Sequence, residues 1–286
     1  MEPGETINHL LKGKEMRKQI SAIVGIFLMI LCLSLSSELY AEAILYGSDA
    51  DRQKLYTIDT TNASAIEVGS FGVEGYIAGL AYDADNDIMY GTTTGTNKLY
   101  SIDYMTGGAT LIGDLGVTMM HGLAYDNSTD MLFGVFGTIG GDGLYRIDVG
   151  TGNSTLIGNI GNLYGDPYDT VCGLAVHPIT NDLYGVIGGP TYGSALVRIN
   201  KTTGSGTLLH EYSSILNMSG LAFLPDGTLY ATDNWSGYLY TLDILSGSTQ
   251  LIGDTGLGNA LGLTCVPEPA TLLLLSLGAV IARKKC

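Results

Sequence analysis

The sequence has few charged residues, and few of these are basic. Asp, Glu, Lys and Arg make up 14% of the 286 residues, with 13 Lys and Arg against 28 Asp and Glu. Residues 44–266 contain 6 basic and 22 acidic residues, so more than half of the basic residues lie outside this range. An acidic body repels a phosphate backbone, which excludes nucleic acid as an expected partner.

Cysteine is also scarce, with four in the chain. Cys32 lies in an apolar N-terminal run and Cys286 is the last residue, which leaves Cys172 and Cys265 in the body. These two fall in repeats that are separated by another repeat, so we expect no disulfide between them. Cys32 lacks the small residues that precede a lipidated cysteine, and no C-x-x-C or His/Cys spacing indicates zinc.

Tryptophan and phenylalanine are rare, whereas glycine and tyrosine are abundant. The chain has 1 Trp and 5 Phe, against 18 Tyr and 41 Gly. Many tyrosines among many glycines are typical of short strands joined by tight turns. The composition therefore favours an all-β protein.

The first 43 residues have the pattern of a targeting segment. Arg17 and Lys18 precede an apolar run from Ile20 to Leu35, and residues 41–43 form an A-x-A-like cleavage site. We expect export through a signal peptide, with Met16 as a candidate true start of translation. An uncleaved N-terminal anchor is the alternative, although the run is shorter than the ~20 residues of a spanning helix.

Four short phrases recur in a fixed order after this segment, about every 45 residues, which is the spacing of four-stranded propeller blades. Each phrase alternates apolar and polar residues and is bounded by turn residues, as expected of strands. The Gly-Leu-Ala type occurs at 79–83, 122–126, 173–176, 220–223 and 262–264, and the Leu-Tyr-Gly type at 45–47, 89–91, 132–134, 183–185 and 229–231. The Leu-Tyr-x-Ile-Asp type occurs at 55–59, 99–103, 144–148, 196–200 and 239–243, and the Thr-Leu-Ile-Gly type at 66–69, 110–113, 155–158, 207–209 and 250–253.

The phasing of the phrases predicts how the array closes. The chain enters at a Leu-Tyr-Gly strand, residues 44–47, and leaves at a Gly-Leu strand, residues 262–265. Each end alone is an incomplete blade, and together they complete one, which removes the exposed edges of an open array. We therefore predict a five-bladed β-propeller over residues 44–266, with four-stranded blades and a ring closed by the N- and C-terminal strands.

The phrases resemble those of the NHL, YVTN and YWTD-like propellers. The best local match is the phrase at 227–233, followed by the one at 238–243. The resemblance covers residues 44–266 and implies that the Gly-Leu-Ala strands line the central channel. The loops that lead into these strands then share one face with the loops that follow Leu-Tyr-Gly. Such propellers include enzymes, receptors and scaffolds, so the resemblance does not specify a function.

His121 and Cys172 each come directly before a Gly-Leu-Ala phrase, so both are expected at the channel mouth. A cysteine near a histidine is the minimum for a thiol nucleophile. A cysteine at a strand entry is more often a small buried apolar residue, and no orienting acid is identifiable. The equivalent residues Ala78, Ser219 and Leu261 make the ring mixed, unlike the several His or acidic ligands of propeller lyases and lactonases. We expect no catalytic site and no enzyme activity.

Asp83, Asp85 and Asp87 have the alternate spacing of a calcium loop. The segment lacks the glycine at loop position six, where Ile88 stands, and the acid at position twelve, where Thr94 stands. It also falls in a predicted hairpin, where carboxylates commonly serve the turn itself. We expect no cofactor, and calcium at this hairpin stays the open alternative.

A candidate ligand-binding face lies around the only tryptophan. Trp235 follows a Leu-Tyr phrase, and the longest insertion, residues 159–169, contributes aromatic and acidic residues to the same face. Such a mixture suits carbohydrate or peptide recognition, whereas a Trp packed between blades is the competing interpretation. The predicted face comprises His121, Tyr164, Asp166, Tyr168, Asp169, Asp233 and Trp235.

The end of the chain carries the most specific motif. A Pro-Glu-Pro segment leads into an apolar run at 272–282 and then into three basic residues. This segment resembles a PEP-CTERM sorting signal, which implies recognition by an exosortase-type membrane enzyme, removal of the tail, and a bacterium that makes exopolysaccharide and biofilm. The motif residues are Val266, Pro267, Glu268, Pro269, Ala270, Thr271, Arg283, Lys284 and Lys285.

The basic end is expected to stay in the cytoplasm while the propeller lies outside. A helix over residues 270–282 is ~20 Å long against a hydrocarbon core of ~30 Å, so it suits a transient signal better than a permanent anchor. An ordinary C-terminal tail anchor is the alternative.

We thus predict a signal region (1–43), a propeller (44–266) and a sorting segment with a hydrophobic helix (267–286). The predicted function is that of an exported binding or scaffold protein of the cell surface or of a biofilm or exopolysaccharide matrix. Its precursor is expected to be tethered to the inner membrane through the terminal hydrophobic segments. The expected partners are an exosortase-type enzyme and an exopolysaccharide or another surface protein. The alternative function is that of a surface lyase or hydrolase acting on a glycan or lactone.

Overall fold

The computed structural model describes residues 43–118, 120–138, 141–163, 170–189, 193–212 and 216–268. All the regular elements in these ranges are β-strands, in agreement with the alternating phrases of the sequence. None of the described residues belongs to a helix that is long and apolar enough to cross a membrane. Residues 1–42 of the predicted signal region (1–43) and the sorting tail beyond Glu268 lie outside the described residues.

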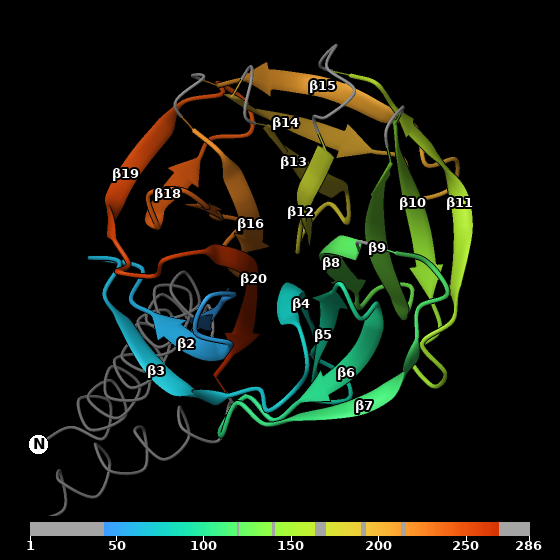
Figure 1. Ribbon diagram of the computed structural model, residues 1–286. Helices are drawn as coiled ribbons and strands as arrows, with labels where there is room; N and C mark the ends of the chain where they lie inside the picture. The colour runs from blue at the N-terminus through green and yellow to red at the C-terminus, as the bar shows by residue number, and fades with distance from the viewer. Residues whose placement is uncertain are drawn as a thin grey trace, which may run out of the picture. The chain divides into compact units, whose positions relative to one another are not determined.

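The described residues form five four-stranded antiparallel sheets arranged as blades around one axis (Figure 1). From the axis outward, blade 1 contains β20 (Ala260–Pro267), β1 (Ala43–Asp49), β2 (Lys54–Ile58) and β3 (Ala65–Ser70), and blade 2 contains β4 (Tyr76–Asp83), β5 (Ile88–Thr94), β6 (Lys98–Ile102) and β7 (Ala109–Asp114). Blade 3 contains β8 (Met120–Asp126), β9 (Met131–Thr138), β10 (Gly141–Ile147) and β11 (Ser154–Gly161), and blade 4 contains β12 (Thr170–Val176), β13 (Leu183–Gly189), β14 (Gly193–Ile199) and β15 (Gly206–Glu211). Blade 5 contains β16 (Met218–Phe223), β17 (Leu229–Asp233), β18 (Tyr238–Leu242) and β19 (Thr249–Asp254).

Blade 1 closes the ring with strands from both ends of the propeller. β20 pairs with β1 in an antiparallel register that runs from Ala43–Pro267 to Asp49–Ala260. In Figure 1 the red β20 therefore lies beside the blue strands of blade 1. The predicted five-bladed ring and its closure are confirmed.

The buried hydrophobic side chains lie between the blades. Among the described residues they form five clusters, and each cluster draws its members from two neighbouring blades. The outward strands of one blade cannot bury their apolar faces without the next blade. The stability of the propeller thus depends on an unbroken ring.

The Gly-Leu-Ala strands β4, β8, β12, β16 and β20 surround the axis, as the resemblance implied (Figure 1). Their glycines allow the close approach of neighbouring strands, because a Cβ on Gly173 would lie 2.4 Å from the Ser219 carbonyl oxygen. The leucine after each glycine is buried, and the space left in the middle of the channel is only ≈ 10 Å³. This Gly-Leu layer separates the two mouths of the channel.

At the outer rim, the glycine that ends the Thr-Leu-Ile-Gly phrase allows one blade to pack closely against the next. A Cβ added to Gly69, Gly113 or Gly158 would lie 2.0 Å from a threonine carbonyl oxygen in a turn of the following blade. Blade 4 has His210 at the equivalent position, and its Nε2 donates a hydrogen bond to the Ile244 carbonyl oxygen at 3.0 Å. The contact between blades is thus kept by a side chain where the glycine is missing.

Candidate functional site

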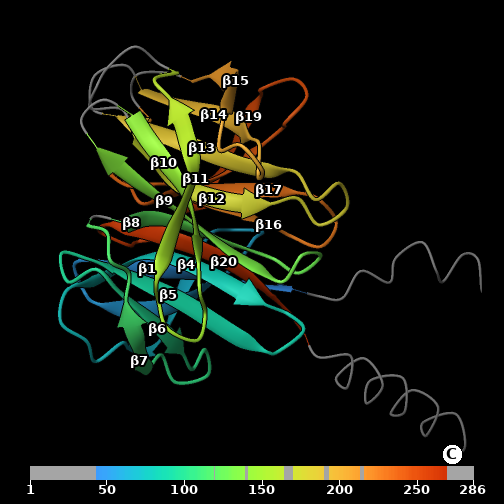
Figure 2. The ribbon, with the colours of Figure 1, turned by 90° about the vertical axis from the view of Figure 1, so that its right-hand side faces the viewer.

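The five inner strands run in the same direction along the axis, which gives the ring two distinct faces. We call the face where the inner strands begin the entry face and the face where they end the exit face. In the side view of Figure 2, β4 and β12 both point toward the exit face. Ala43 and Pro267, the first and last residues of the paired closing strands, also lie on the exit face.

The entry face has a hollow at the channel mouth, which we call the entry well. Its volume is ≈ 190 Å³. The five residues that precede or begin the Gly-Leu-Ala phrases all line it, so the predicted mixed ring of Ala78, His121, Cys172, Ser219 and Leu261 is confirmed. Four further residues complete the described lining: Tyr76, Asn217, Asn234 and Asn259.

Asp233 positions two of the three asparagines of the entry well. Its buried carboxylate accepts the backbone N–H of Asn217 at 2.6 Å and that of Trp235 at 3.0 Å. The Asn234 N–H donates to the Asn217 carbonyl oxygen at 2.8 Å. A carboxylate that accepts several backbone N–H groups fixes the loops that carry them. Asp233 therefore lies behind the lining and holds the two amides in place.

The amide groups of Asn234 and Asn259 are only partly satisfied. The Asn259 Nδ2 donates to the Asp51 carboxylate at 3.4 Å. Among the described residues, the buried Oδ1 atoms of Asn234 and Asn259 have no hydrogen-bond donor. Buried polar atoms in native proteins almost always have a partner, so each of these two acceptors calls for a hydrogen-bond donor from water or from a ligand.

His121 and Cys172 lie in the same entry well, but their surroundings do not make a nucleophile. Burial lowers the pKa of His121, so its imidazole is neutral at pH 7. The Cys172 thiol donates to the Thr170 carbonyl oxygen at 3.4 Å. Within the described lining of the entry well no residue is an Asp or Glu, so no carboxylate of the lining orients the imidazole.

The other predicted ligand-face residues have different positions. Trp235 directly follows Asn234 and is 55% exposed, which argues against a packing role between blades. Tyr164, Asp166, Tyr168 and Asp169 lie outside the described residues. Their part in ligand binding stays a prediction.

Sequence reasoning missed the asparagines and Tyr76, although a signal was present. Tyr76, Asn217 and Asn259 each stand two residues before a member of the mixed ring, at Ala78, Ser219 and Leu261. Residues i and i+2 of an extended segment point to the same side, so the well-facing set extends one step outward at the starts of β4, β16 and β20.

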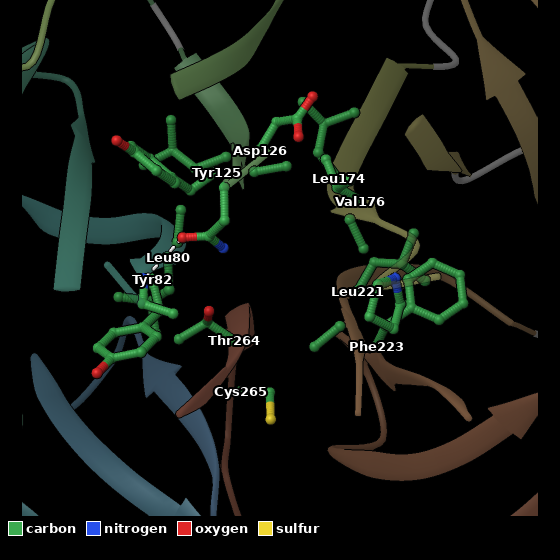
Figure 3. A pocket seen from close by; sticks show the side chains of 18 of the residues that line it. Leu80, Tyr82, Tyr125, Asp126, Leu174, Val176, Leu221, Phe223, Thr264 and Cys265 are labelled. Atoms are coloured by element: carbon green, nitrogen blue, oxygen red, sulfur yellow. Dashed lines mark hydrogen bonds between the residues drawn. The ribbon is translucent and has the colours of Figure 1, made fainter. Parts of the chain in front are cut away.

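The exit face has a second hollow, the exit cup, with a volume of ≈ 260 Å³ (Figure 3). Leu80, Leu174 and Leu221 form its floor, and Tyr82, Tyr125 and Phe223 stand around it. The tyrosine hydroxyls are already bonded to carboxylates, as in the 2.6 Å bond from Tyr82 to Asp87. Cys265 also lines the cup, and burial raises the pKa of its thiol to about 12. The exit cup was not predicted from the sequence, although its lining includes residues that directly follow the Gly-Leu-Ala phrases, such as Tyr82 and Tyr125.

The calcium candidates lie in the β4–β5 hairpin on the exit face. Asp83 accepts the backbone N–H groups of Asp85 at 3.1 Å and Asn86 at 3.0 Å, while Asp87 accepts the hydroxyls of two tyrosines. In the part of the chain that the structure describes, no three His, Cys, Asp or Glu residues are grouped to hold a metal ion. Asp83 and Asp87 thus serve the hairpin, as the turn interpretation predicts, and calcium binding there stays the untested alternative.

An ion pair between blades involves Asp126, which lines the exit cup. Asp126 of blade 3 is fully buried, and Lys201 from the β14–β15 turn of blade 4 donates to it at 2.5 Å. Burial alone would raise the pKa of Asp126, but the hydrogen bonds from Lys201, Ser128 and Thr129 outweigh it and lower the pKa. The pair therefore stabilises the ionised carboxylate and ties the two blades together.

We expect Lys201→Met to lower the free energy of unfolding at pH 7 by about 3 kcal/mol, since it leaves a buried carboxylate without its cation. A carboxylate whose pKa is lowered by folding stabilises the protein above its unfolded pKa of ~3.9 and loses this effect as the pH falls through the folded pKa. The difference from wild type should thus shrink in acid. Urea unfolding at pH 7 and at about pH 3 measures both quantities.

The control is Lys54→Met, which breaks the exposed 2.8 Å pair between Lys54 and Glu67. An exposed pair contributes little, so this variant should unfold like wild type at both pH values. An equal loss in both lysine variants would show that the buried pair has no special role.

Comparisons with known proteins identify the C-terminal segment. Residues 266–285 match the family model of the PEP-CTERM protein-sorting motif. The motif marks the chain as an exported, membrane-passing precursor that is sorted by an exosortase. No curated protein sequence matches the chain.

The body is similar to solved propeller structures at low sequence identity. A chain of the crystal structure of a nidogen/laminin complex has a TM-score of 0.55 and 13% identity, with 78% of this chain and 98% of that chain covered. A protein of unknown function from Bacteroides thetaiotaomicron VPI-5482 has a TM-score of 0.50 and 18% identity, with 73% and 54% covered. At these identities the similarity shows the fold alone.

The sorting motif begins inside the propeller. Val266 is buried and pairs with Ile44, and Pro267 pairs with Ala43, at the end of β20. Glu268 is half-buried, and the motif residues from Pro269 onward lie outside the described residues. The closing strand thus runs into the sorting signal without a linker.

Proposed function

We propose that the protein is a non-catalytic binding or scaffold component of the bacterial cell surface or of its biofilm matrix. The overlap of the sorting motif, 266–285, with the closing strand β20 carries this proposal. An exosortase-type enzyme that cuts beyond Glu268 leaves β20 whole. The product is then a complete propeller, released or attached at the outside of the cell.

The two faces of the ring support a display role. The exit face carries both ends of the propeller, so a precursor tethered through its tail presents the entry face on its far side. The entry well is then directed away from the point of attachment, where a glycan or another surface protein can reach it.

A surface enzyme acting on a glycan or lactone is the second candidate, because His121 and Cys172 share the entry well. Such an enzyme needs a group that orients the imidazole or stabilises developing charge. The described lining offers amides and hydroxyls that suit charge stabilisation, but no acid and no charged group, and we weigh this in favour of the scaffold role.

The test is intact mass and cell fractionation in the native host, with and without its sorting enzyme. We expect the wild-type protein to lose both terminal segments and to appear at the surface or in the matrix. Without the enzyme, and in a Glu268→Ala/Pro269→Ala variant, a species that retains the C-terminal tail should stay in the membrane fraction. Asn153→Ala, an exposed exit-face substitution, should be processed like wild type.

A full-length wild-type protein that remains in the inner membrane would contradict the proposal. It would leave an anchored periplasmic propeller whose partner lies within the envelope.

A further inference from the structure

The entry well is built almost entirely of neutral hydrogen-bonding groups around a small apolar floor. We propose that it binds one uncharged sugar ring, at the end or at a branch of a glycan. This inference rests on the proposed function, for which it names the class of ligand and the residues that recognise it.

The amides supply the hydrogen-bond chemistry that a sugar needs. Each carboxamide of Asn217, Asn234 and Asn259 has both donors and an acceptor, and a sugar hydroxyl also both donates and accepts. The unpartnered Oδ1 atoms of Asn234 and Asn259 require donors, which ring hydroxyls provide. The terminal torsion of Asn is broad, so rotation about it lets either atom of the carboxamide face a group in the well.

The charges select a neutral ligand. The described lining of the well contains no Asp, Glu, Lys or Arg, and burial keeps His121 uncharged at pH 7. Residues 44–266 carry 6 basic and 22 acidic side chains, a difference of 16 negative charges, which repels acidic glycans and phosphates. A bound cation is also disfavoured, because the nearby Asp233 carboxylate is occupied by backbone N–H groups.

The size and shape of the well fit one ring. Its ≈ 190 Å³ is smaller than the ~300–1,000 Å³ of pockets for drug-sized ligands. Ala78 and Leu261 offer apolar contacts for the C–H face of a sugar, and the ring of Tyr76, 38% exposed, stands at the rim. The Gly-Leu layer below leaves only ≈ 10 Å³, so a polymer cannot thread through the channel. The ligand must therefore enter as a terminal or branching unit.

The experiment is isothermal titration of the full chain, purified in a detergent without a sugar headgroup. The probes are glucose, galactose, mannose, N-acetylglucosamine and N-acetylgalactosamine, with glucuronic acid as the charged comparison. We expect at least one neutral sugar to bind with a dissociation constant of about 1 mM or lower, and glucuronic acid to bind more weakly. The emission of Trp235, the only tryptophan, should change on binding because it adjoins Asn234.

Variants locate the site. Asn234→Ala and Asn259→Ala should each weaken binding about tenfold, since each removes one hydrogen-bonding amide. His121→Phe, which keeps a ring in the wall, is the further variant if either alanine substitution prevents folding, and it too should weaken binding. Asn153→Ala, an exposed amide on the exit face, should bind like wild type, and circular dichroism verifies that each variant is folded.

The inference would be overturned if none of the five neutral sugars bound at a concentration of about 10 mM, which is ten times the expected dissociation constant. Binding that survives the Asn234, Asn259 and His121 substitutions would overturn the assignment to the entry well, and tighter binding of glucuronic acid would overturn the neutral class. These results do not depend on processing, so a failed binding experiment leaves the sorting proposal standing, and failed sorting leaves the binding result intact.

Discussion

A chain that runs from residue 43 to 259 is expected not to fold, whereas a chain that runs from 43 to 268 is expected to unfold in one cooperative transition. The difference is β20, the inner strand of blade 1. Without it, β1 has an unpaired edge at the axis and two blade interfaces lose part of their core.

The expected effect is comparable with the stability of a typical domain. Leu263 belongs to the cluster between blades 5 and 1, and Val266 to the cluster between blades 1 and 2. Each buried side chain of this size contributes ~1.5–3 kcal/mol, and the lost strand pairing adds to it, against a total of ~5–15 kcal/mol. Far-UV circular dichroism with thermal unfolding measures the result.

The chain that ends at residue 268 is the matched control, because it lacks the tail but retains all of β20. A cooperative transition in the shorter chain would contradict the claim that the ring must close to be stable. If neither chain folded, the residues beyond 268 would themselves be required for folding.

Gly113→Ala is expected to lower the free energy of unfolding by about 3 kcal/mol or more, the upper end of the cost of overpacking. The added Cβ would lie 2.0 Å from the Thr151 carbonyl oxygen and 2.9 Å from its carbon. Both are backbone atoms of a turn in the next blade, so no side-chain rotation relieves the contact. The two blades must move apart.

Gly108→Ala is the matched control for this substitution, because its nearest neighbour would be the Thr106 hydroxyl at 3.6 Å, an ordinary contact distance. We expect it to change the stability by less than about 1 kcal/mol. Urea unfolding of the two variants measures both values. Equal stability would show that the blades tolerate separation at the outer rim.

The five-bladed ring could be predicted because each strand is encoded by a short sequence phrase, and the phrases recur from blade to blade. Each phrase has the two-residue period of a strand, and the order of phrases at the two ends of the propeller leaves one arrangement that completes every blade. The residues just before the Gly-Leu-Ala phrases, such as His121 and Ser219, could be placed at the channel mouth for the same reason.

The entry well was less predictable because its amides come from non-repeated loops. Asn217, Asn234 and Asn259 fall outside the recurring phrases, and they converge only because the ring brings blades 5 and 1 together. The interblade pair of Asp126 and Lys201 joins residues 75 positions apart for the same reason. A strand pattern predicts which side of a strand faces inward, but the contacts of a loop depend on the neighbouring blade.

The closing strand also sets the order of events during export. Because the first blade is completed by β20, which precedes the sorting signal, the ring cannot close until almost all of the propeller has crossed the membrane. Pairing of strands so far apart in sequence is slow, and the unpaired edge of β1 is open to association with other chains until then. Under the proposed function, we expect the tail to stay in the membrane during this interval, so that the precursor is released only after its ring has closed.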